Sequence, residues 1–519
     1  MSETNERISN KEDYQPLTFK EKISYAMGSL PGNFYGTFLG QINAFYYAWM
    51  GLASIYIVIA QIFYGAWNLI NDPIFGILQD RTKHKDGRYI PWIKWFSPLL
   101  TIGFILVFFP PDNWNIASGG PEYQIPLFVW YLISQMVYDT AFTIVYIAHV
   151  ALLPQMSMSQ KERTDLAVYC VILSFVGLAI SAYFPVKYLV NPNAELIAEF
   201  KIVIFIFAIL GYIPWWILTR NVKEKAEFIP PEDTPFVESI KCVFKNPSGR
   251  IYMLYDGITV GITNFVMGSI TFLLAWTFGQ NSFYQAQNPD WNLFALLPYV
   301  LPAFGAILLG SKLQFYLGTK FDIKTALTVM FVFLIIGFSI GFYGALPTPN
   351  APFDSYTLPR SLPLVGIGVF FICLGLPGDF IYHNPMRAET IDMDEMLTGE
   401  RRESVYAGVG CLLSKPMISV ALATVPAILT AYGLVKDETS MDQGLIATMG
   451  WPTAITGVAI ACFLVPLILA VLGLIVWVFY PIDRYKMAEI RACLDDLHQK
   501  KRIERLDREG GSRFVDSKK

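Results

Sequence analysis

The sequence predicts an all-α membrane protein in which twelve transmembrane helices form two six-helix bundles. The chain has 519 residues, of which 54% are hydrophobic and only 16% are charged, and its mean hydropathy is +0.42. Its apolar residues form long blocks, whereas a soluble protein of this length would show short periodic stripes. The long blocks, a polar stretch at mid-chain and the placement of Lys and Arg together predict this fold class.

The apolar blocks are long enough to cross a membrane, because a spanning helix needs about 20 mostly apolar residues. Twelve blocks meet this criterion, centred approximately on residues 22–48, 52–79, 92–111, 124–152, 165–187, 200–219, 250–278, 292–317, 325–345, 361–386, 404–432 and 452–480. Each block predicts one transmembrane helix. An even number of crossings places both ends of the chain on the same side of the membrane.

Lys and Arg concentrate in the segments that follow the second, fourth, sixth, eighth and tenth blocks. The alternate segments are nearly bare, and residues 111–123 and 279–291 contain no Lys or Arg. Because cytoplasmic loops of membrane proteins are enriched in basic residues, both termini are expected in the cytoplasm. We therefore expect a multi-pass protein of the plasma (inner) membrane.

A polar stretch that contains Pro230, Pro231 and Pro235 separates the first six blocks from the last six. Prolines in a polar stretch favour a linker. After the last block the chain is charged, with apolar residues at helical spacing, which predicts an amphipathic helix. The predicted organisation is an N-terminal bundle, a cytoplasmic linker, a C-terminal bundle and a cytoplasmic tail, at residues 1–219, 220–249, 250–480 and 481–519 respectively.

The most informative residues lie inside the second block, where Asn71, Asp72 and Pro73 interrupt an apolar helix. An ionised aspartate at membrane depth costs at least about 2.5 kcal/mol. A chain keeps such a group where it faces a cavity, an ion or a charged partner. This stretch therefore predicts a solute pathway. It is followed at the cytoplasmic end by Gly76, Asp80, Arg81, Gly87 and Arg88.

Several other classes of protein are not expected. The six cysteines have no short pair spacing, which disfavours a metal site or a disulfide framework. The stretch GAILLGSK (305–312) has the wrong order for a phosphate-binding loop. No zinc-binding helix motif or nucleophile elbow is found. We therefore expect neither an enzyme nor a cofactor, and no metal beyond a coupling sodium ion. Transport driven by an ion gradient remains.

Three motifs carry a resemblance to a known family. The first is the run from Asn71 to Arg88, the second is AETIDMDEMLTGERRESVYAG (388–408), and the third is YPIDRYKMAEIRACL (480–494). With these motifs the chain resembles the glycoside–pentoside–hexuronide:cation symporter family of the major facilitator superfamily. The resemblance implies the fold of that superfamily, alternating access of two six-helix bundles around a central site, and uptake driven by a sodium or proton gradient.

The resemblance also implies a cation site between helices two and four. The family uses two aspartates one turn apart on helix two, an asparagine beside the second, and a threonine on helix four. Asn71, Asp72 and Thr143 match the last three, whereas Asn68 replaces the first aspartate. Asp139 stands four residues before Thr143 and shares its helix face. We expect that one carboxylate has moved to helix four and that all five residues bind the cation.

Two alternatives to this site stay open. In one, Asp72 alone carries the coupling proton, and burial raises the affinity of its carboxylate for that proton. In the other, Asp139 pairs with a basic group or lies near the outer interface. Lys415 on helix eleven matches a family lysine near the cation site, and an intramembrane lysine needs a negative partner or a water-filled cavity. The alternative for Lys415 is a side chain that extends to an interface.

The sugar-binding residues of the family are not reproduced. The family's two sugar-binding aspartates and its arginine correspond here to Asn33, Tyr146 and Val171, so its known galactoside recognition, in which charged groups bind several hydroxyls, is not expected. Other polar groups are expected to face the cavity. The predicted substrate-binding residues are Asn33, Tyr146, His149, Asn264, Asp379, His383 and Lys415. The alternative for each histidine is a packing residue.

A further group of residues is predicted to gate access from the cytoplasm. In the superfamily such residues form charge pairs and helix-end contacts that stabilise one access state. A simple topology anchor would explain Arg81 and Arg88 but not Asp80. The predicted gating residues are Gly76, Asp80, Arg81, Gly87, Arg88, Arg401, Arg402 and Glu403.

The function that these observations favour is cation-coupled symport of a glycoside, a sugar or a related polar organic solute. Two alternatives are a carrier of lysolipids or other amphiphiles with the same fold, and a sensor that binds solute without moving it. The expected partners are a small-molecule substrate and the lipid bilayer. Neither nucleic acid nor an obligate protein partner is expected.

Overall fold

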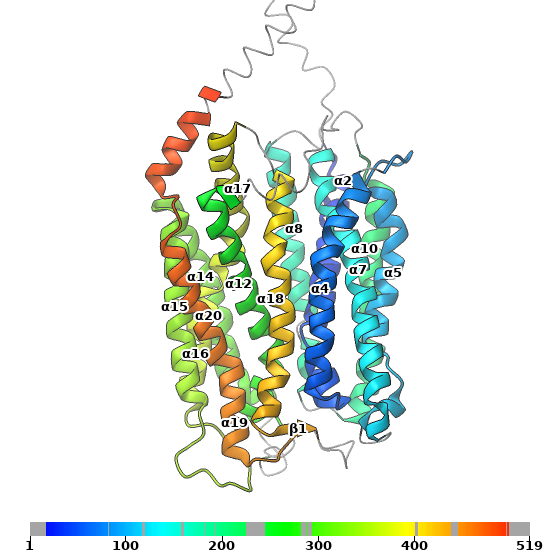
Figure 1. Cartoon of the computed structure of the whole chain (residues 1–519), viewed down its shortest axis with the longest axis vertical. Helices are drawn as coiled ribbons and strands as arrows, with labels where there is room; N and C mark the ends of the chain where they lie inside the picture. The colour runs from blue at the N-terminus through cyan, green and yellow to red at the C-terminus, as the bar shows by residue number, and fades with distance from the viewer. Residues whose placement is uncertain are drawn as a thin grey trace, which may run out of the picture. The chain divides into compact units, whose positions relative to one another are not determined.

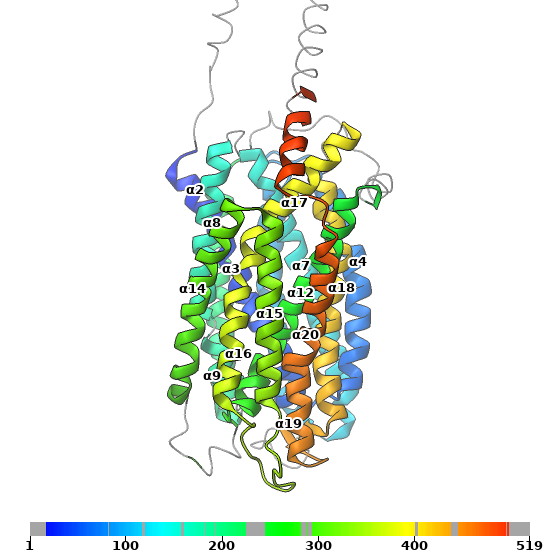
Figure 2. The ribbon, with the colours of Figure 1, turned by 90° about the vertical axis from the view of Figure 1, so that its left-hand side faces the viewer.

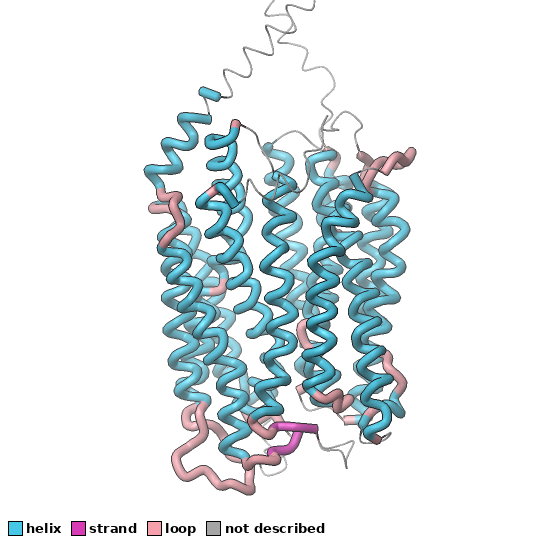
Figure 3. Tube along the Cα trace, viewed as in Figure 1, coloured by secondary structure: helices cyan, strands magenta, loops and turns pink. Residues whose placement is uncertain are grey.

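The computed structural model describes residues 17–80, 82–116, 120–156, 160–181, 183–190, 193–224, 244–281, 288, 293–399, 403–436, 445–494 and 496–497. These residues are almost entirely helical, as the cyan tube in Figure 3 shows. Packing divides them into two units. Unit 1 lies within Met1–Phe45 and Ile70–Pro231, and unit 2 lies within Tyr46–Leu69 and Glu232–Lys519.

Eleven helices in the described part of the chain are long and apolar enough to cross a membrane. They coincide with the second to the twelfth of the apolar blocks. The first block is folded in three pieces, α2 (Phe19–Ala26), α3 (Ser29–Leu39) and the π-helix η1 (Ala44–Trp49). Glycines at both junctions, Gly28 and Gly40, help to explain the breaks, because glycine weakens a continuous helix.

Unit 1 contains α2 and α3, the second half of α4 (Ser54–Asp80), and four long helices. These are α5 (Ile90–Phe108), α7 (Gln124–Met156), α8 (Gln160–Ser181) and α10 (Ala194–Asn221), with the short α9 (Tyr183–Leu189) before α10. In Figure 1, α5 lies beside α7 and α10, and the contacts between these helices agree. Two short 3-10 helices, η2 (Asp112–Trp114) and η3 (Pro121–Tyr123), connect α5 to α7.

Aromatic side chains fill the interior of unit 1. Phe38 of α3 packs edge-on against Phe104 of α5, with ring centroids 5.8 Å apart. Phe108 of α5 meets Phe200 of α10 at 5.5 Å. All four side chains are completely buried, and each aromatic pair contributes about 0.5–1.5 kcal/mol beyond its buried area. This interior fixes α5 and α10 around α3.

Unit 2 contains the remaining long helices. Its elements are α12 (Pro247–Phe272) with η5 (Leu273–Thr277), η6 (Leu293–Leu296), α14 (Leu297–Lys320), α15 (Ile323–Ala345), α16 (Leu362–Gly375), α17 (Pro377–Thr398), α18 (Glu403–Ala431), α19 (Trp451–Ala459), η7 (Ile460–Leu464) and α20 (Val465–Val478). Figure 2 shows α14, α15 and α16 side by side. A short antiparallel hairpin of β1 (Leu434–Lys436) and β2 (Leu445–Ala447) follows α18.

The stretch before the middle of α4 groups with unit 2. Tyr47 donates a hydrogen bond to the carbonyl of Leu434 and lies 2.9 Å from the hydroxyl of Thr430. Further along, a side chain at Gly65 would come within 3.2 Å of Ser419. These contacts explain why residues 46–69 pack with α18, although in sequence they lie within the predicted N-terminal bundle, 1–219.

The chain continues after α20 as a helix over residues 484–494. Met487, Ile490 and Leu494 are buried on one side of it. This is the amphipathic helix that the spacing of apolar residues predicts for the tail.

Candidate functional site

Two hydrogen bonds join α4 to α7 in unit 1, and they involve four of the five predicted cation-binding residues. The amide of Asn71 donates to Asp139 Oδ2 at 3.2 Å, and the hydroxyl of Thr143 donates to Asp72 Oδ1 at 3.1 Å. Asp139 and Thr143 are one turn apart on α7, so the two bonds form neighbouring rungs between the helices. Sequence reasoning therefore grouped residues that the structure brings together.

Three of the four residues that form the rungs are buried within the protein, and Asp72 is half-buried. Asn71 is 1% exposed, Asp139 is 6% exposed and Thr143 is 3% exposed. Asp139 also lies near the middle of the 33-residue helix α7, away from either end. This position disfavours the interpretation that Asp139 lies near the outer interface.

A second contact fixes the two helices beside the rungs. Gln79 of α4 donates its amide to the carbonyl of Ile144 on α7 at 2.8 Å. Gln79 follows Asn71 by about two helical turns. Three side-chain bonds therefore set the register of α4 against α7 over this length.

Several buried polar atoms near the rungs have no hydrogen-bond partner. They are Asn71 Oδ1 and both amide atoms of Asn68, a residue that is 2% exposed. Asn68 precedes Asp72 by four residues and shares its face of α4. Leaving a buried polar atom unpaired costs about 1–3 kcal/mol. A bound ion or water would supply the missing partners.

The donor set at this place consists of oxygens. Two carboxylates, one hydroxyl and the amide oxygens of two asparagines are available. Oxygen ligands with negative charge suit hard cations such as sodium, and the carboxylates also accept protons. The residues present therefore fit the coupling ion that the family resemblance implies.

The three predicted substrate residues of unit 1 lie in or against the interrupted first helix. The amide of Asn33 donates within its own helix to the carbonyl of Ser29 at 3.0 Å. The hydroxyl of Tyr146 lies 3.5 Å from the carbonyl of Gly28. A Cβ at Gly32 would come 2.5 Å from the same hydroxyl, so glycine is required where the Tyr146 ring crosses α3.

His149 is enclosed by aromatic rings and by backbone. Its Nε2 lies 3.0 Å from the carbonyl of Tyr25, and the two rings stack at 4.4 Å. Trp215 meets the imidazole edge-on at 5.4 Å. The side chain is buried. These contacts favour the packing alternative for this histidine.

In unit 2 the structure gathers two predicted residues around a third that sequence reasoning missed. His383 of α17 lies between two carboxylates, with Nε2 3.5 Å from Asp256 Oδ1 and Nδ1 3.9 Å from Asp379 Oδ1. Tyr255 of α12 donates its hydroxyl to Asp379 at 2.8 Å. Asp256 is an acidic residue inside an apolar block, the same signal that identified Asp72, so the sequence contained the means to find it.

Two further predicted substrate residues belong to unit 2, Asn264 on α12 and Lys415 on α18. The amide of Asn264 donates within α12 to the carbonyl of Val260 at 2.9 Å. Lys415 is half-buried on α18. Their role in substrate binding stays a prediction.

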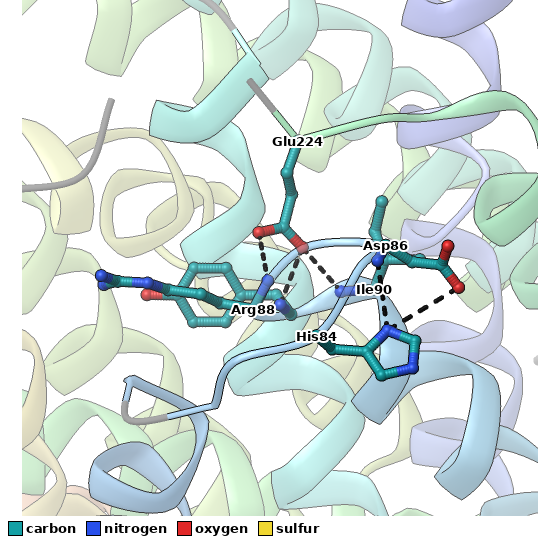
Figure 4. A network of polar contacts seen from close by, with 6 residues as sticks. His84, Asp86, Arg88, Ile90 and Glu224 are labelled. Carbon is teal, nitrogen blue, oxygen red and sulfur yellow. Dashed lines mark hydrogen bonds and ion pairs between the residues drawn. The ribbon is translucent and has the colours of Figure 1, made fainter. Parts of the chain in front are cut away.

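The gating motif contains a carboxylate cradle that Figure 4 shows in detail. Glu224, which follows α10, accepts hydrogen bonds from the backbone N–H groups of Arg88, Tyr89 and Ile90 at 2.6, 2.7 and 2.8 Å. These N–H groups lie at the start of α5, where a helix has no internal acceptors and carries partial positive charge. A carboxylate is therefore held where it stabilises the helix most.

Gly87 makes this cradle accessible. Its φ is +108°, and a Cβ at this position would overlap the Glu224 carboxyl group. Glycine alone meets both conditions without strain. Sequence reasoning identified Gly87 and Arg88 but missed Glu224, because no local pattern connects a residue beyond α10 to the start of α5.

The remaining gating residues carry fewer observations. Gly76 lies in α4, with open space where a side chain would stand. The other five lie outside what the structure describes, either entirely or in their side chains: Asp80, Arg81, Arg401, Arg402 and Glu403. A gating role for this group stays a prediction.

The fold and the polar groups inside its spans define a membrane transporter of the major facilitator type. A bacterial homologue of the human lysosomal transporter Spinster, solved in an inward-facing state, superposes with a TM-score of 0.56 at 13% identity, covering 92% of this chain and 97% of that one. The family model described as "MFS/sugar transport protein" matches residues 24–484. The chain therefore belongs to this family.

Relatives by sequence are named as symporters. The symporter sll1374 of Synechocystis sp. is 22% identical over 560 residues, which cover 94% of this chain and 99% of the relative. The glycoside/cation symporter YagG of Escherichia coli is 23% identical over 62% of this chain and 65% of its own length. The sodium-dependent lysophosphatidylcholine symporter 1 of Gallus gallus is 28% identical, over 33% of this chain and 31% of its own length.

These comparisons confirm several predictions. The resemblance to the glycoside–pentoside–hexuronide:cation symporter family is confirmed, and so is the fold class of the major facilitator superfamily. The relatives and the structural neighbour are transporters, which confirms the prediction of a multi-pass membrane transporter rather than an enzyme. The cytoplasmic location of the two termini stays a prediction.

Proposed function

We propose that this protein is a secondary active transporter that couples the entry of a cation to the uptake of a glycoside, a sugar or a related polar solute. The observation that carries the proposal is the pair of rungs between α4 and α7, with Asp72 and Asp139 one on each helix. The family description names sugar transport, and the relatives sll1374 and YagG are symporters. All of these point to the same activity in the plasma (inner) membrane.

The coupling step follows from the charges at the rungs. Two carboxylates on neighbouring helices, one buried (Asp139) and one half-buried (Asp72), repel each other when both are ionised, and the repulsion is strong where water is scarce. A cation between them removes this repulsion and gives the unpaired amide oxygens of Asn68 and Asn71 a partner. Binding therefore stabilises the close approach of α4 and α7. An ion gradient then biases which arrangement of these helices is populated.

No cofactor takes part in this proposal. The components are the coupling ion (sodium or a proton), the solute and the lipid bilayer, and neither nucleic acid nor a further protein is required. Within the described residues, no group of three or more His, Cys, Asp and Glu side chains has the arrangement to hold a metal ion. The cation at the rungs is cargo rather than a resident metal.

A second cargo has one observation in its favour. About a third of the chain matches lysophosphatidylcholine symporters described as sodium-dependent. The lengths covered by YagG and sll1374 are greater, and the full-length match supports a symporter without naming a lipid. We therefore keep the amphiphile as an outcome of the test rather than as the proposal.

The test begins with melting temperatures of the purified full-length protein. The additives are labelled disaccharides, pentosides, hexuronides and lysophosphatidylcholine, each in sodium and in choline buffers. A ligand at a hundred times its dissociation constant adds about 2.7 kcal/mol to the native state. We expect a sugar or glycoside to stabilise the protein. Stabilisation by lysophosphatidylcholine alone would replace the sugar in the proposal by an amphiphile.

The stabilising solute then enters a transport assay in sealed liposomes. Wild-type protein is expected to exchange labelled for unlabelled solute and to accumulate it uphill in an ion gradient. Asp72→Asn is expected to abolish accumulation, and the control Asp354→Asn, at an exposed loop position, is expected to keep it. Binding without exchange would show a sensor, and unaltered accumulation in Asp72→Asn would remove Asp72 from the coupling site.

A further inference from the structure

The cluster around His383 in unit 2 has the composition of a proton site. One imidazole stands between two carboxylates that come from different helices, Asp256 from α12 and Asp379 from α17. Asp379 and His383 are one turn apart on α17, and α12 packs against α17. The cluster is therefore built by tertiary packing and is not a chance pair of neighbours on one helix surface.

The three side chains form a gradient of exposure. The side chain of Asp256 is 6% exposed, that of Asp379 is 19% exposed and that of His383 is 30% exposed. The imidazole is therefore the most exposed group of the cluster, and the carboxylate of Asp256 is its buried end. Imidazole and carboxylate groups both bind protons, so each of the three side chains is a candidate proton acceptor.

The charges inside the cluster make a proton its best ligand. With both carboxylates ionised and the imidazole neutral, the cluster carries two negative charges in a poorly solvated place, which is costly. Tyr255 donates its hydroxyl to Asp379 at 2.8 Å and so supplies one hydrogen bond to that carboxylate. The incoming proton then binds at Asp256 or at His383 Nε2, which lies 3.5 Å from Asp256 Oδ1. It comes from water, and no other bond is formed or broken.

We propose that Asp256, Asp379 and His383 form a proton-binding site in unit 2, separate from the cation site on α4 and α7. This assignment goes beyond the proposed function, which needs one cation at the rungs. It also gives Asp379 and His383 a role other than the substrate contacts that the sequence predicts. A metal ion is a poorer fit, since no metal-holding group is present among the described residues.

Other charged and polar groups of unit 2 lie near the cluster and act on its charge. Arg387, one turn after His383, acts electrostatically on Asp256 and donates to Asn384 Oδ1 at 2.6 Å. Ser414 of α18 lies beside the Asp256 carboxylate. Tyr252 of α12 also lies here, with its ring 6.1 Å from that of His383, and Lys415 follows Ser414 on α18.

The proposal is tested on the purified full-length protein without any solute. Infrared difference spectra are recorded between about pH 4 and 8, where histidine and carboxyl groups titrate. We expect a carboxylic-acid C=O band that appears on acidification. Because the other carboxyl groups of the chain titrate in the same range, the spectra of each variant are subtracted from those of the wild type. Asp256→Asn is expected to lose one component of the band, and His383→Gln is expected to shift the midpoint of that component. An unchanged band and midpoint in both variants would overturn the proposal.

Control variants separate this outcome from failure of the cation site. Asp72→Asn is expected to leave the proton signal of unit 2 intact while it abolishes ion-driven accumulation, so the two proposals fail independently. His149→Gln controls for the loss of any buried histidine. If Asp256→Asn fails to fold, Asp256→Glu replaces it, because a glutamate keeps the band but shifts its frequency and midpoint. A glutamate variant identical to wild type would overturn the assignment.

A second measurement observes the imidazole directly. The four histidines of the chain are labelled with ¹⁵N, and their nitrogen signals are followed with pH. The signal that disappears in His383→Gln identifies this residue. We expect its titration midpoint to move in Asp256→Asn but not in the exposed control Asp354→Asn. A His383 midpoint that is the same in Asp256→Asn and in the wild type would show that the two side chains do not bind a proton together.

Discussion

Replacing Glu224 should destabilise unit 1 by breaking the carboxylate cradle at the start of α5. Three backbone N–H groups donate to its two oxygens at 2.6–2.8 Å. Loss of a capping group costs about 0.5–2 kcal/mol, and a carboxylate at a helix start adds about 0.3–1 kcal/mol through the helix dipole. We therefore expect a cost of about 1 kcal/mol for Glu224→Gln and about 2 kcal/mol for Glu224→Ala, from these two ranges.

The assay is thermal unfolding of the purified protein in detergent. One kcal/mol corresponds to about 2–4 °C in melting temperature for a domain of 150–250 residues. Glu122→Gln, an exposed glutamate in η3, is the matched control and should leave the melting temperature unchanged. Gly87→Ala should lower it by a similar amount to Glu224→Ala, because the new Cβ displaces the same carboxylate.

A double-mutant cycle decides whether the cradle is the cause. If both changes break one contact, Gly87→Ala should cost less in the Glu224→Ala background than in the wild type, with a coupling on the order of 1 kcal/mol. Additive effects, or a Glu224→Ala protein as stable as the wild type, would refute the reasoning. In that case the short N–H to carboxylate distances would not report a stabilising contact.

Three further predictions follow from the site geometry. Gly32→Ala should lower the melting temperature and leave ion binding intact, because its Cβ would stand 2.5 Å from the Tyr146 hydroxyl; the combination with Tyr146→Phe should recover part of the loss, and no recovery would contradict this. His149→Phe should keep transport, measured by solute exchange, because His149 packs against Tyr25; loss of exchange in a stable variant would make it functional. Thr143→Ala should lower the affinity for the cation about 10-fold, or about 1.4 kcal/mol, near the low end for a hydrogen bond to a charged group. Thr143→Ser should restore the affinity in a binding titration, and equal affinity of Thr143→Ala and the wild type would exclude the hydroxyl as a ligand.

The architecture was predictable because membrane insertion makes a strong demand on sequence. Every spanning helix must be apolar over about 20 residues, so the blocks are visible without any tertiary information. The exception is the first block, where α2, α3 and η1 replace one continuous helix. The break at Gly28 lies against His149, since a Cβ there would come 2.6 Å from His149 Nε2. His149 is more than a hundred residues away, and hydropathy carries no signal for such a contact.

The site was predictable in part for a related reason. Acidic residues inside apolar blocks are costly, so Asp72 and Asp139 stood out, and the structure joins their helices. Asp256 carries the same signal and was overlooked because no family motif draws attention to it. Glu224 could not be found, since its partners are backbone N–H groups at residues 88–90 and any carboxylate placed there by folding would serve.

The central claim is that one carboxylate of the cation site has moved from the second transmembrane helix (α4) to the fourth (α7). The most direct measurement is uphill accumulation of the stabilising solute in liposomes, driven separately by a sodium gradient and by a proton gradient. Whichever ion drives the wild type, Asp139→Asn should abolish accumulation. Adding Asn68→Asp to that variant returns a carboxylate to helix two and should restore it. Full accumulation by Asp139→Asn alone would contradict the account.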